Sequence, residues 1–385
     1  MTDQCSFALV CFMRNARIIA PAHHEKAYYH CVSRIVNREF VLHEEEKEKF
    51  VELMRTYEKL YGLRVLTYCV MTNHFHILVE VPQRPEKDLS DEELVKLVGE
   101  CLGEKEGRQL KWRIDHYIKQ NNQKALQELR ELLHGRMWNI SQFMKVLKGR
   151  FSQWFNKKHS RTGTLWEGRF NSTLVQGEGR ALKTMAGYID LNPVRAKMHD
   201  DPKDYRWCGY AEAVAGQTKA REALHYLTTI SHAGGLKPEE YRPTNQRESL
   251  EMWRRYLYGV PENPRMVKEY RELQAKAEAR YKGSASEGKI DVLSSSRQRL
   301  PREKALEVLA KEGKLNGYEI LSCRVRYFTD GAAIGAKSFV EEVFQANREK
   351  FGKRRKEGAQ RVNEIAQGMK EGFHTLRTLK EQAFT

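Results

Sequence analysis

Residues 63–81, LRVLTYCVMTNHFHILVEV, contain two apolar runs that are separated by a short polar turn. The first run, residues 63–70, and the second, residues 75–81, are rich in β-branched, aromatic and aliphatic residues and have the length of β-strands. Thr72 and Asn73 lie between them, so the two strands are expected to form a hairpin. This stretch therefore predicts an antiparallel sheet.

The segments on either side of the hairpin predict an α+β fold. Residues 27–36 (AYYHCVSRIV) have the composition of a strand, and residues 44–61 have apolar side chains at helical spacing before Gly62 ends the helix. A fourth strand is expected over residues 164–175 and a helix over residues 179–192. This order indicates an antiparallel sheet with helices on one face.

The composition is that of a folded, basic protein. Hydrophobic residues make up 40% of the chain and charged residues 31%, which is typical of a globular protein. The length of 385 residues suits two or three domains. No apolar run approaches the roughly 20 residues that span a bilayer. The net charge of +16 favours a polyanionic partner, most often nucleic acid, although a basic protein without such a partner is the alternative.

The cysteines and the N-terminus exclude two further classes. The seven cysteines form no CxxC pair, so neither a zinc ribbon nor a disulfide scaffold is indicated, and a reducing cytoplasm suits them. Asp3 precedes the apolar residues 7–13, whereas a secretory signal needs positive charge there. We expect no signal peptide, and Met13 is an alternative start of the protein.

His74 and His76 flank Phe75 at the beginning of the third strand. Side chains two residues apart on a strand share a face, so both imidazoles are expected to point the same way. Two imidazoles on one face can hold a divalent metal ion. The alternative is a pair of histidines satisfied by hydrogen bonds on a sheet surface.

Tyr188 and Asn192 are four residues apart in ALKTMAGYIDLNP, residues 181–193. On a helix they lie on one face, one turn from each other. The amide oxygen of Asn192 suits a hard cation, and Tyr188 would then stand beside the metal. The alternative is a core tyrosine followed by an Asn-Pro helix stop.

These groups together suit phosphodiester chemistry. A divalent metal neutralises and orients a scissile phosphate, and a phenol oxygen that attacks phosphorus leaves a phosphotyrosine. The phosphotyrosine link keeps the DNA end activated, so that the phosphodiester bond can be formed again with another strand. Because one nucleophile cuts one strand, the substrate should be single-stranded DNA or a hairpin.

Three segments resemble a known family, and they occur in the family's order. MTNHFHILVEV (residues 71–81) resembles the HUH strand of the single-tyrosine HUH transposases. GTLWEGRFNS (residues 163–172) and YIDLNPVRA (residues 188–196) resemble signature segments of the REP-associated tyrosine transposases. The resemblance covers about residues 13–216.

The resemblance implies a ferredoxin-like catalytic domain that uses Mg²⁺ or Mn²⁺. His74 and His76 match the metal-binding histidines, and Tyr188 matches the nucleophile. Asn192 stands where classical single-tyrosine transposases carry a glutamine, and its role as third metal ligand rests on that position.

Residues 145–161, KVLKGRFSQWFNKKHSR, interleave basic and aromatic residues and suggest a DNA-binding surface. The alternative places Phe151, Trp154 and Phe155 in the core of an amphipathic helix. Arg169 and Arg195 either steer the DNA backbone or pair with nearby carboxylates. The expected DNA-binding residues are Lys148, Arg150, Lys157, Lys158, Arg161, Arg169 and Arg195.

The chain is expected to divide into three regions. Residues 13–216 form the catalytic domain, with a charged helical insertion over about residues 84–142, and residues 217–292 form a helical connector and linker. Residues 293–385 form a mainly helical region with a basic tail. One interpretation is a helix-turn-helix DNA reader with its turn at Gly335, and the other is a helical cap on the catalytic domain.

The sequence therefore predicts a transposase that cleaves and transfers single strands of hairpin-forming repeat DNA in the cytoplasm, associated with the nucleoid. It predicts no membrane partner and no small-molecule cofactor, and leaves monomer and homodimer open. The alternatives are a non-catalytic DNA-binding protein that keeps the HUH fold, and a nuclease that uses water or acts on RNA.

Overall fold

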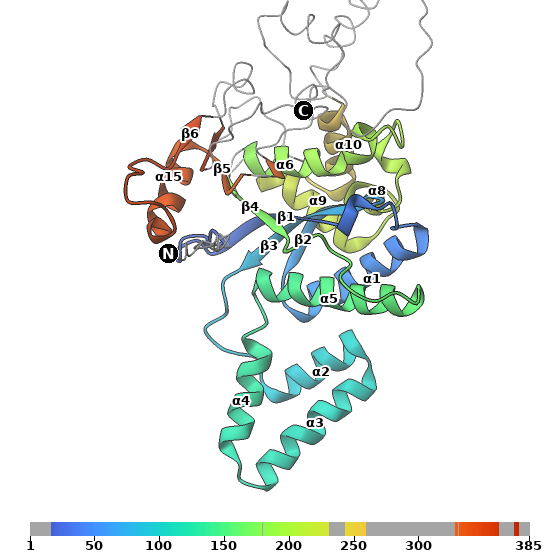
Figure 1. Cartoon of the computed structure of the whole chain (residues 1–385), viewed down its shortest axis with the longest axis vertical. Helices are drawn as coiled ribbons and strands as arrows, with labels where there is room; N and C mark the ends of the chain where they lie inside the picture. Colours follow the sequence, from blue (N-terminus) through green and yellow to red (C-terminus); the bar gives the residue numbers. More distant parts are fainter. Residues whose placement is uncertain are drawn as a thin grey trace, which may run out of the picture.

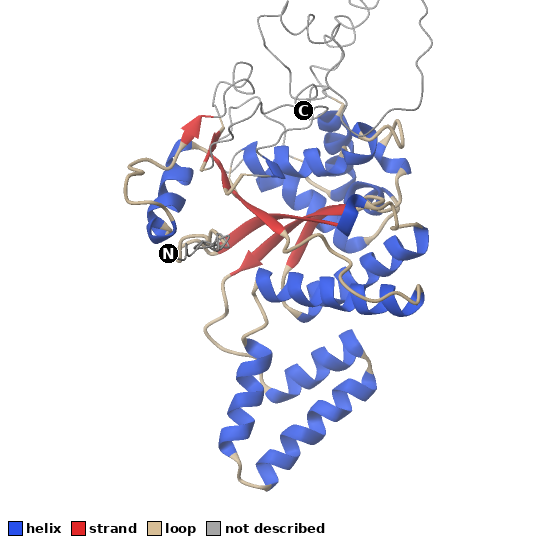
Figure 2. Cartoon of the chain, in the orientation of Figure 1, coloured by secondary structure: helices blue, strands red, loops and turns tan. Residues whose placement is uncertain are grey.

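The computed structural model describes residues 17–178, 180–230, 243–258, 328–329, 331–361 and 373–376. Within these residues the chain forms one seven-stranded sheet with the strand order β2-β3-β1-β4-β5-β7-β6 (Figures 1 and 2). The alternative start at Met13 and the linker expected before residue 293 lie outside the described residues. The strands are β1 (Lys26–Arg34), β2 (Arg64–Val70), β3 (His74–Pro82), β4 (Asn171–Val175), β5 (Ala333–Gly335), β6 (Gln360–Arg361) and β7 (His374–Thr375).

The first four strands have the ferredoxin-like arrangement. They lie in the order β2-β3-β1-β4, and each neighbouring pair is antiparallel. Helix α1 (Glu44–Leu60) connects β1 to β2, and helix α5 (Ile140–Lys158) precedes β4. The predicted α+β fold and the predicted hairpin of β2 and β3 are confirmed.

The alternation of side chains along the strands creates two separate cores. Tyr29 of β1 and Phe75 of β3 face α1 and α5, where they pack with Phe50 and Phe151. The neighbouring residue Tyr28 belongs to the core on the other face. Because strand side chains alternate between faces, this register also assigns His74 and His76 to the second face.

This second face is also covered by helices, whereas the sequence suggested helices on one face. Leu66, Cys69 and Leu78 make the face apolar, so its burial requires a further layer. Among the described helices, none is long and apolar enough to cross a membrane. The covering elements are α6 (Arg180–Asp190), α7 (Asn192–Arg195), η2 (Pro202–Asp204), α8 (Gly209–Val214), α9 (Thr218–Ile230) and α10 (Gln246–Leu257).

A three-helix insertion follows β3 and extends away from the sheet (Figure 1). Its helices α2 and α3 approach closely because glycines meet at their contact: a Cβ on Gly107 would lie 2.9 Å from the Cα of Gly99. The helices are α2 (Asp91–Leu102), α3 (Glu104–Lys119) and α4 (Gln123–His134).

The described C-terminal residues extend the sheet. Strand β5 pairs in parallel with β4, and β7 then pairs with β5. Gly335, where the helix-turn-helix interpretation placed a turn, is the last residue of β5 and is soon followed by α15 (Lys337–Ala346) and η4 (Arg348–Lys350). These residues therefore pack on the same sheet as the first four strands.

Candidate functional site

The two predicted metal-binding histidines lie at one end of the sheet. His76 pairs with Val32 and His74 pairs with Arg34 at the end of β1. Their ring centroids are 5.1 Å apart, with the rings at 79° to each other. Both imidazoles lie on the face covered by α6, so the expected common orientation is found.

A third histidine, His30 of β1, joins the pair. Its ring stacks on His76 at a centroid distance of 5.1 Å, and its Nε2 lies 2.9 Å from Nδ1 of His76. On its other side, Nδ1 of His30 lies 2.7 Å from the carbonyl oxygen of Phe328. His30 was not among the site residues predicted from the sequence. The sequence pattern that could have identified His30 is its position in a predicted strand, two residues from Tyr28 and therefore on the same face.

The hydrogen bonds of His30 determine the tautomer of His76. The carbonyl of Phe328 can only accept, so His30 donates from Nδ1 and its Nε2 is unprotonated. That nitrogen then accepts from Nδ1–H of His76, which leaves Nε2 of His76 unprotonated. Metal-binding histidines are commonly held in this way by a second hydrogen bond.

Asn73 places His74 in the corresponding tautomer. Nδ1 of His74 lies 2.7 Å from Oδ1 of Asn73, which can only accept, so His74 donates from Nδ1, and in its neutral ring Nε2 is the nitrogen that can bind a metal. The amide of Asn73 is itself held, because its Nδ2 donates to the carbonyl of Arg38. Both histidines of the pair therefore have the form that ligates a metal.

Burial keeps the imidazoles of His30 and His76 neutral. It lowers the pKa of His30 to about 4, and the carbonyl of Phe328 only partly opposes the shift. Burial, together with the neighbouring His74 and His30, holds the pKa of His76 well below its usual value. Neutral imidazole is the form that binds metal, so the histidines fit a divalent cation.

Tyr188 of α6 lies beside the histidines. Its ring centroid is 6.3 Å from that of His76 and 6.4 Å from that of His30, both in edge-on geometry. Tyr188 is only 2% exposed, because α6 is buried between the sheet and the outer helices. The sheet and the helix therefore bring together three residues that the sequence predicted to converge.

Asn192 and Arg195 follow Tyr188 on α7. The Nδ2 of Asn192 donates to the carbonyl oxygen of Ile189 over 3.0 Å, so this end of the amide is committed to the helix and Oδ1 is the atom left to serve as a ligand. The guanidinium of Arg195 lies 3.9 Å above the ring centroid of Tyr188 and also donates to the Tyr188 carbonyl. Arg195 thus orients the tyrosine.

Phe328 covers the tyrosine from the C-terminal part of the chain. Its ring meets that of Tyr188 edge-on with the centroids 4.9 Å apart, and its carbonyl oxygen accepts from both His30 and Thr173. The contact between the Phe328 and Tyr188 rings could not be predicted from the sequence, because the two residues are 140 positions apart and no local pattern connects them.

Lys148 has a different environment from the one expected of a phosphate contact. Its Nζ donates to the carbonyl oxygen of Gly168 over 2.7 Å, and burial lowers its pKa to about 8. It also lies 5.3 Å from the ring centroid of Trp166. This lysine therefore holds the loop before β4 instead of facing solvent.

The remaining basic candidates lie nearer the surface. Lys158 forms ion pairs of 2.6 Å with Glu45 and 2.7 Å with Glu46, and Arg161 lies 3.8 Å from Glu39. The aromatic residues Phe151 and Phe155 are in the core, as the alternative interpretation of this helix requires. The exposed cations of the expected set are Arg150, Lys157, Lys158 and Arg169.

The loop after β1 is an additional feature at the histidine end of the sheet. Asn37 and Arg38 both have left-handed backbone conformations, with φ of 55° and 59°, which non-glycine residues rarely adopt. Phe40, which follows, is 66% exposed. Since Asn73 bonds to the carbonyl of Arg38, this loop is linked directly to His74.

The antiparallel ferredoxin-like sheet carries its histidine pair on β3, within the part of the chain that matches a known family. Residues 23–91, from the segment before β1 to the start of α2, match the family model described as IS200-like transposase. This match includes residues 71–81 and agrees with their resemblance to the single-tyrosine transposases, whereas residues 163–172 and 188–196 lie outside the matched range.

The chain is also similar to a solved structure described as a REP-associated tyrosine transposase bound to a REP hairpin. The similarity covers 53% of this chain and 87% of that one, at 11% identity and a TM-score of 0.34. No curated protein matches the chain.

Proposed function

We propose that this protein is a metal-dependent transposase that cleaves and transfers single-stranded DNA through a covalent link to Tyr188. The proposal rests mainly on one observation: the rings of His76 and Tyr188, from a strand and a distant helix, lie 6.3 Å apart beside His74. Two unprotonated imidazole nitrogens and a phenol in one site suit phosphodiester cleavage.

His74 and His76 would hold Mg²⁺ or Mn²⁺ through Nε2, with Oδ1 of Asn192 as the third ligand. When bound, the ion supplies the charge that neutralises and orients the scissile phosphate. His30 holds His76 in the required tautomer through the 2.9 Å hydrogen bond. The ligands are thus oriented before the substrate arrives.

Tyr188 performs the chemical step. Its phenol releases its proton to water, and the phenolic oxygen forms a bond to phosphorus while the P–O bond on the opposite side breaks. The leaving nucleoside oxygen takes up a proton and becomes a hydroxyl. The phosphotyrosine is then attacked by another strand's hydroxyl, which regenerates the phenol and completes the transfer. Arg195, 3.9 Å above the ring, keeps the phenol in position.

The proposed substrate is a DNA hairpin with an unpaired flank, and the repeats that form such hairpins are the proposed target. Exposed cations near the site, among them Arg38 and Arg169, provide the phosphate contacts. The exposed ring of Phe40 offers a surface for stacking an unpaired base. A protein of this kind acts on chromosomal DNA, so association with the nucleoid in the cytoplasm is part of the proposal.

The decisive experiment uses labelled single-stranded hairpin DNA with Mn²⁺ and a denaturing gel. The expected result is a covalent protein–DNA adduct with the wild-type chain, and its loss in Tyr188→Phe and in the double variant His74→Ala/His76→Ala. Tyr210→Phe is the matched control, since Tyr210 is a buried tyrosine of the same helical layer. Cleavage that persists in Tyr188→Phe would disprove the tyrosine mechanism.

A non-catalytic DNA-binding protein is the second candidate. The burial of Tyr188, which is 2% exposed and packs edge-on against Phe328, favours it, because a phosphate has to reach the phenol for cleavage to occur. Hairpin binding without an adduct, under conditions in which Mn²⁺ binds, would support this candidate.

A further inference from the structure

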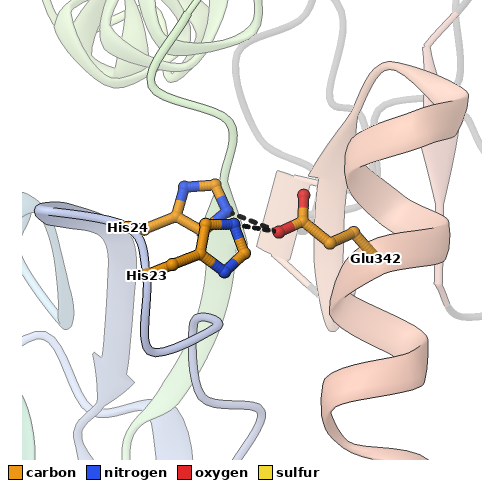
Figure 3. Close-up of side chains that lie close together, drawn as sticks. All are labelled: His23, His24 and Glu342. Carbon is orange, nitrogen blue, oxygen red and sulfur yellow. Dashed lines mark hydrogen bonds and ion pairs between the residues drawn. The ribbon is translucent and has the colours of Figure 1, made fainter.

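A second group of potential metal ligands lies at the other end of β1. His23 and His24 precede this strand, and Glu342 belongs to α15. Nε2 of His23 lies 2.7 Å and Nε2 of His24 lies 3.0 Å from the same oxygen of Glu342 (Figure 3). Within the described ranges, this is the one group of three or more His, Cys, Asp or Glu side chains whose ligand atoms lie within 4.8 Å of one another.

The two histidines stand on an anchored turn. The amide of His24 donates to the carbonyl of Pro21, and the side chain of Gln83 donates to the carbonyls of Ala22 and His24. The His24 ring also packs edge-on against Phe339 of α15, with the centroids 6.1 Å apart. The donors therefore come from two fixed elements and need little reorganisation to bind an ion.

We propose that His23, His24 and Glu342 bind a divalent transition-metal ion of the Zn²⁺ type. Two imidazoles and a carboxylate are a ligand set that zinc accepts, with water in the fourth position, and His23 is 71% exposed, so water has access. Tetrahedral ligands around zinc lie about 3.3 Å apart, so the two imidazole nitrogens, at 2.7 and 3.0 Å from the Glu342 oxygen, need to move away from it by only about 0.3–0.6 Å. The ion replaces the two imidazole protons that otherwise face Glu342.

This site is separate from the one beside Tyr188. His74 pairs with Arg34 at the last residue of β1, whereas His23 and His24 precede its first residue, Lys26. Eight residue steps at about 3.3 Å each separate the two ends by roughly 26 Å. The two sites cannot share an ion, and this inference does not depend on the proposed DNA cleavage.

The bound ion would fasten the C-terminal residues to the sheet. Strand β5 pairs with β4 at only two positions, Leu174 with Ala333 and Val175 with Ile334. The segment before β1 supplements this contact, because Asn347 exchanges two hydrogen bonds with the backbone of Ile19. A metal bridge between His24 and Glu342 spans 318 positions of the chain, and closing so long a loop restricts the unfolded state.

The test uses the full chain with His74→Ala and His76→Ala, so that the site beside Tyr188 no longer competes for metal. After chelation, Zn²⁺ is added and thermal unfolding is followed. Saturating Zn²⁺ is expected to raise the unfolding midpoint by roughly 5 °C. Hydrogen exchange of the α15 amides should slow as well, and Co²⁺ should give the visible absorption of a tetrahedral site.

Three variants in this background decide the outcome. His23→Gln and Glu342→Gln should both lose the Zn²⁺-dependent shift and the Co²⁺ absorption. His23 is largely exposed, so its replacement should leave the fold intact. Glu349→Gln is the matched control, because Glu349 is an exposed carboxylate near the same helix and should leave both signals unchanged. No Zn²⁺ effect in the starting protein, or an effect that survives in both ligand variants, would overturn the proposal.

Discussion

Replacement of His30 provides a quantitative test of how the site is organised. His30→Ala removes the acceptor that lies 2.9 Å from Nδ1 of His76, while His76 stays buried. His76 then either keeps an unsatisfied N–H or moves its proton to Nε2, where it blocks the metal-binding lone pair. We therefore expect weaker metal binding without any change to a direct ligand.

The size of the effect follows from the lost hydrogen bond. A buried donor left without its acceptor costs about 1–3 kcal/mol, which corresponds to a loss of roughly 5- to 150-fold in affinity. Loss of a group that orients a metal ligand typically costs about 10- to 100-fold. The two ranges agree, so we expect Mn²⁺ to bind about 10- to 100-fold more weakly to His30→Ala.

The assay is Mn²⁺ titration of the full chain, with free Mn²⁺ followed by electron paramagnetic resonance. His30→Gln keeps a carbonyl acceptor and should bind Mn²⁺ better than His30→Ala. His225→Ala is the matched control, because His225 forms a 2.7 Å hydrogen bond with Ser249 in the same helical layer. Unchanged Mn²⁺ affinity in a folded His30→Ala protein would refute the role assigned to His30.

Three further predictions concern stability and DNA binding. Burial raises the pKa of Asp190 to about 7, above its unfolded value near 3.9, so the stability contributed by its neutral form is lost as the pH rises from about 4 to 7. The free energy of unfolding, measured by urea denaturation, should therefore fall by roughly 4 kcal/mol between pH 4 and pH 8. Asp190→Asn should remove this fall. Gly209→Ala should destabilise the fold by about 1–3 kcal/mol in the same denaturation assay, because the added Cβ would lie 2.3 Å from Oγ1 of Thr67. Gly149→Ala is the control: its Cβ would have no atom within 4 Å, so the change should be neutral or slightly stabilising. Lys148→Met should leave the salt dependence of hairpin affinity unchanged, because the Lys148 ammonium donates to the carbonyl of Gly168. Lys157→Ala should reduce the slope of log affinity against log salt concentration by about 0.7–0.9. An equal reduction in both variants would contradict the assignment of Lys148 to the protein interior.

Local patterns were sufficient for the centre of the fold. The strand expected over residues 75–81 is found as His74–Pro82, and the helix expected over residues 44–61 as Glu44–Leu60. Strand periodicity of two residues places His74 and His76 on a common face whatever packs against them. The fourth strand was predicted too long: it begins at Asn171, because residues 163–170 form a loop that Lys148 and Trp166 tie to α5.

The surroundings of the predicted residues could not be read from local patterns. Lys148 and Lys157 look alike in the sequence, yet one is buried against a carbonyl and the other is exposed. Strand β5 has only three residues, too few to show a periodicity, and it exists because β4 offers it an edge.

The sequence by itself determined the order of the first four strands and their connecting helices along the chain. It also determined that His74 and His76 share a face and that Tyr188 lies on a later helix. Only the tertiary structure decided that His30 and the carbonyl of Phe328 set the tautomer of His76, and that the Phe328 ring covers Tyr188. Periodicity acts between neighbours in the chain, and it fixes the direction of a side chain. A hydrogen-bond partner 298 positions away is fixed by how the layers pack, which no local pattern encodes.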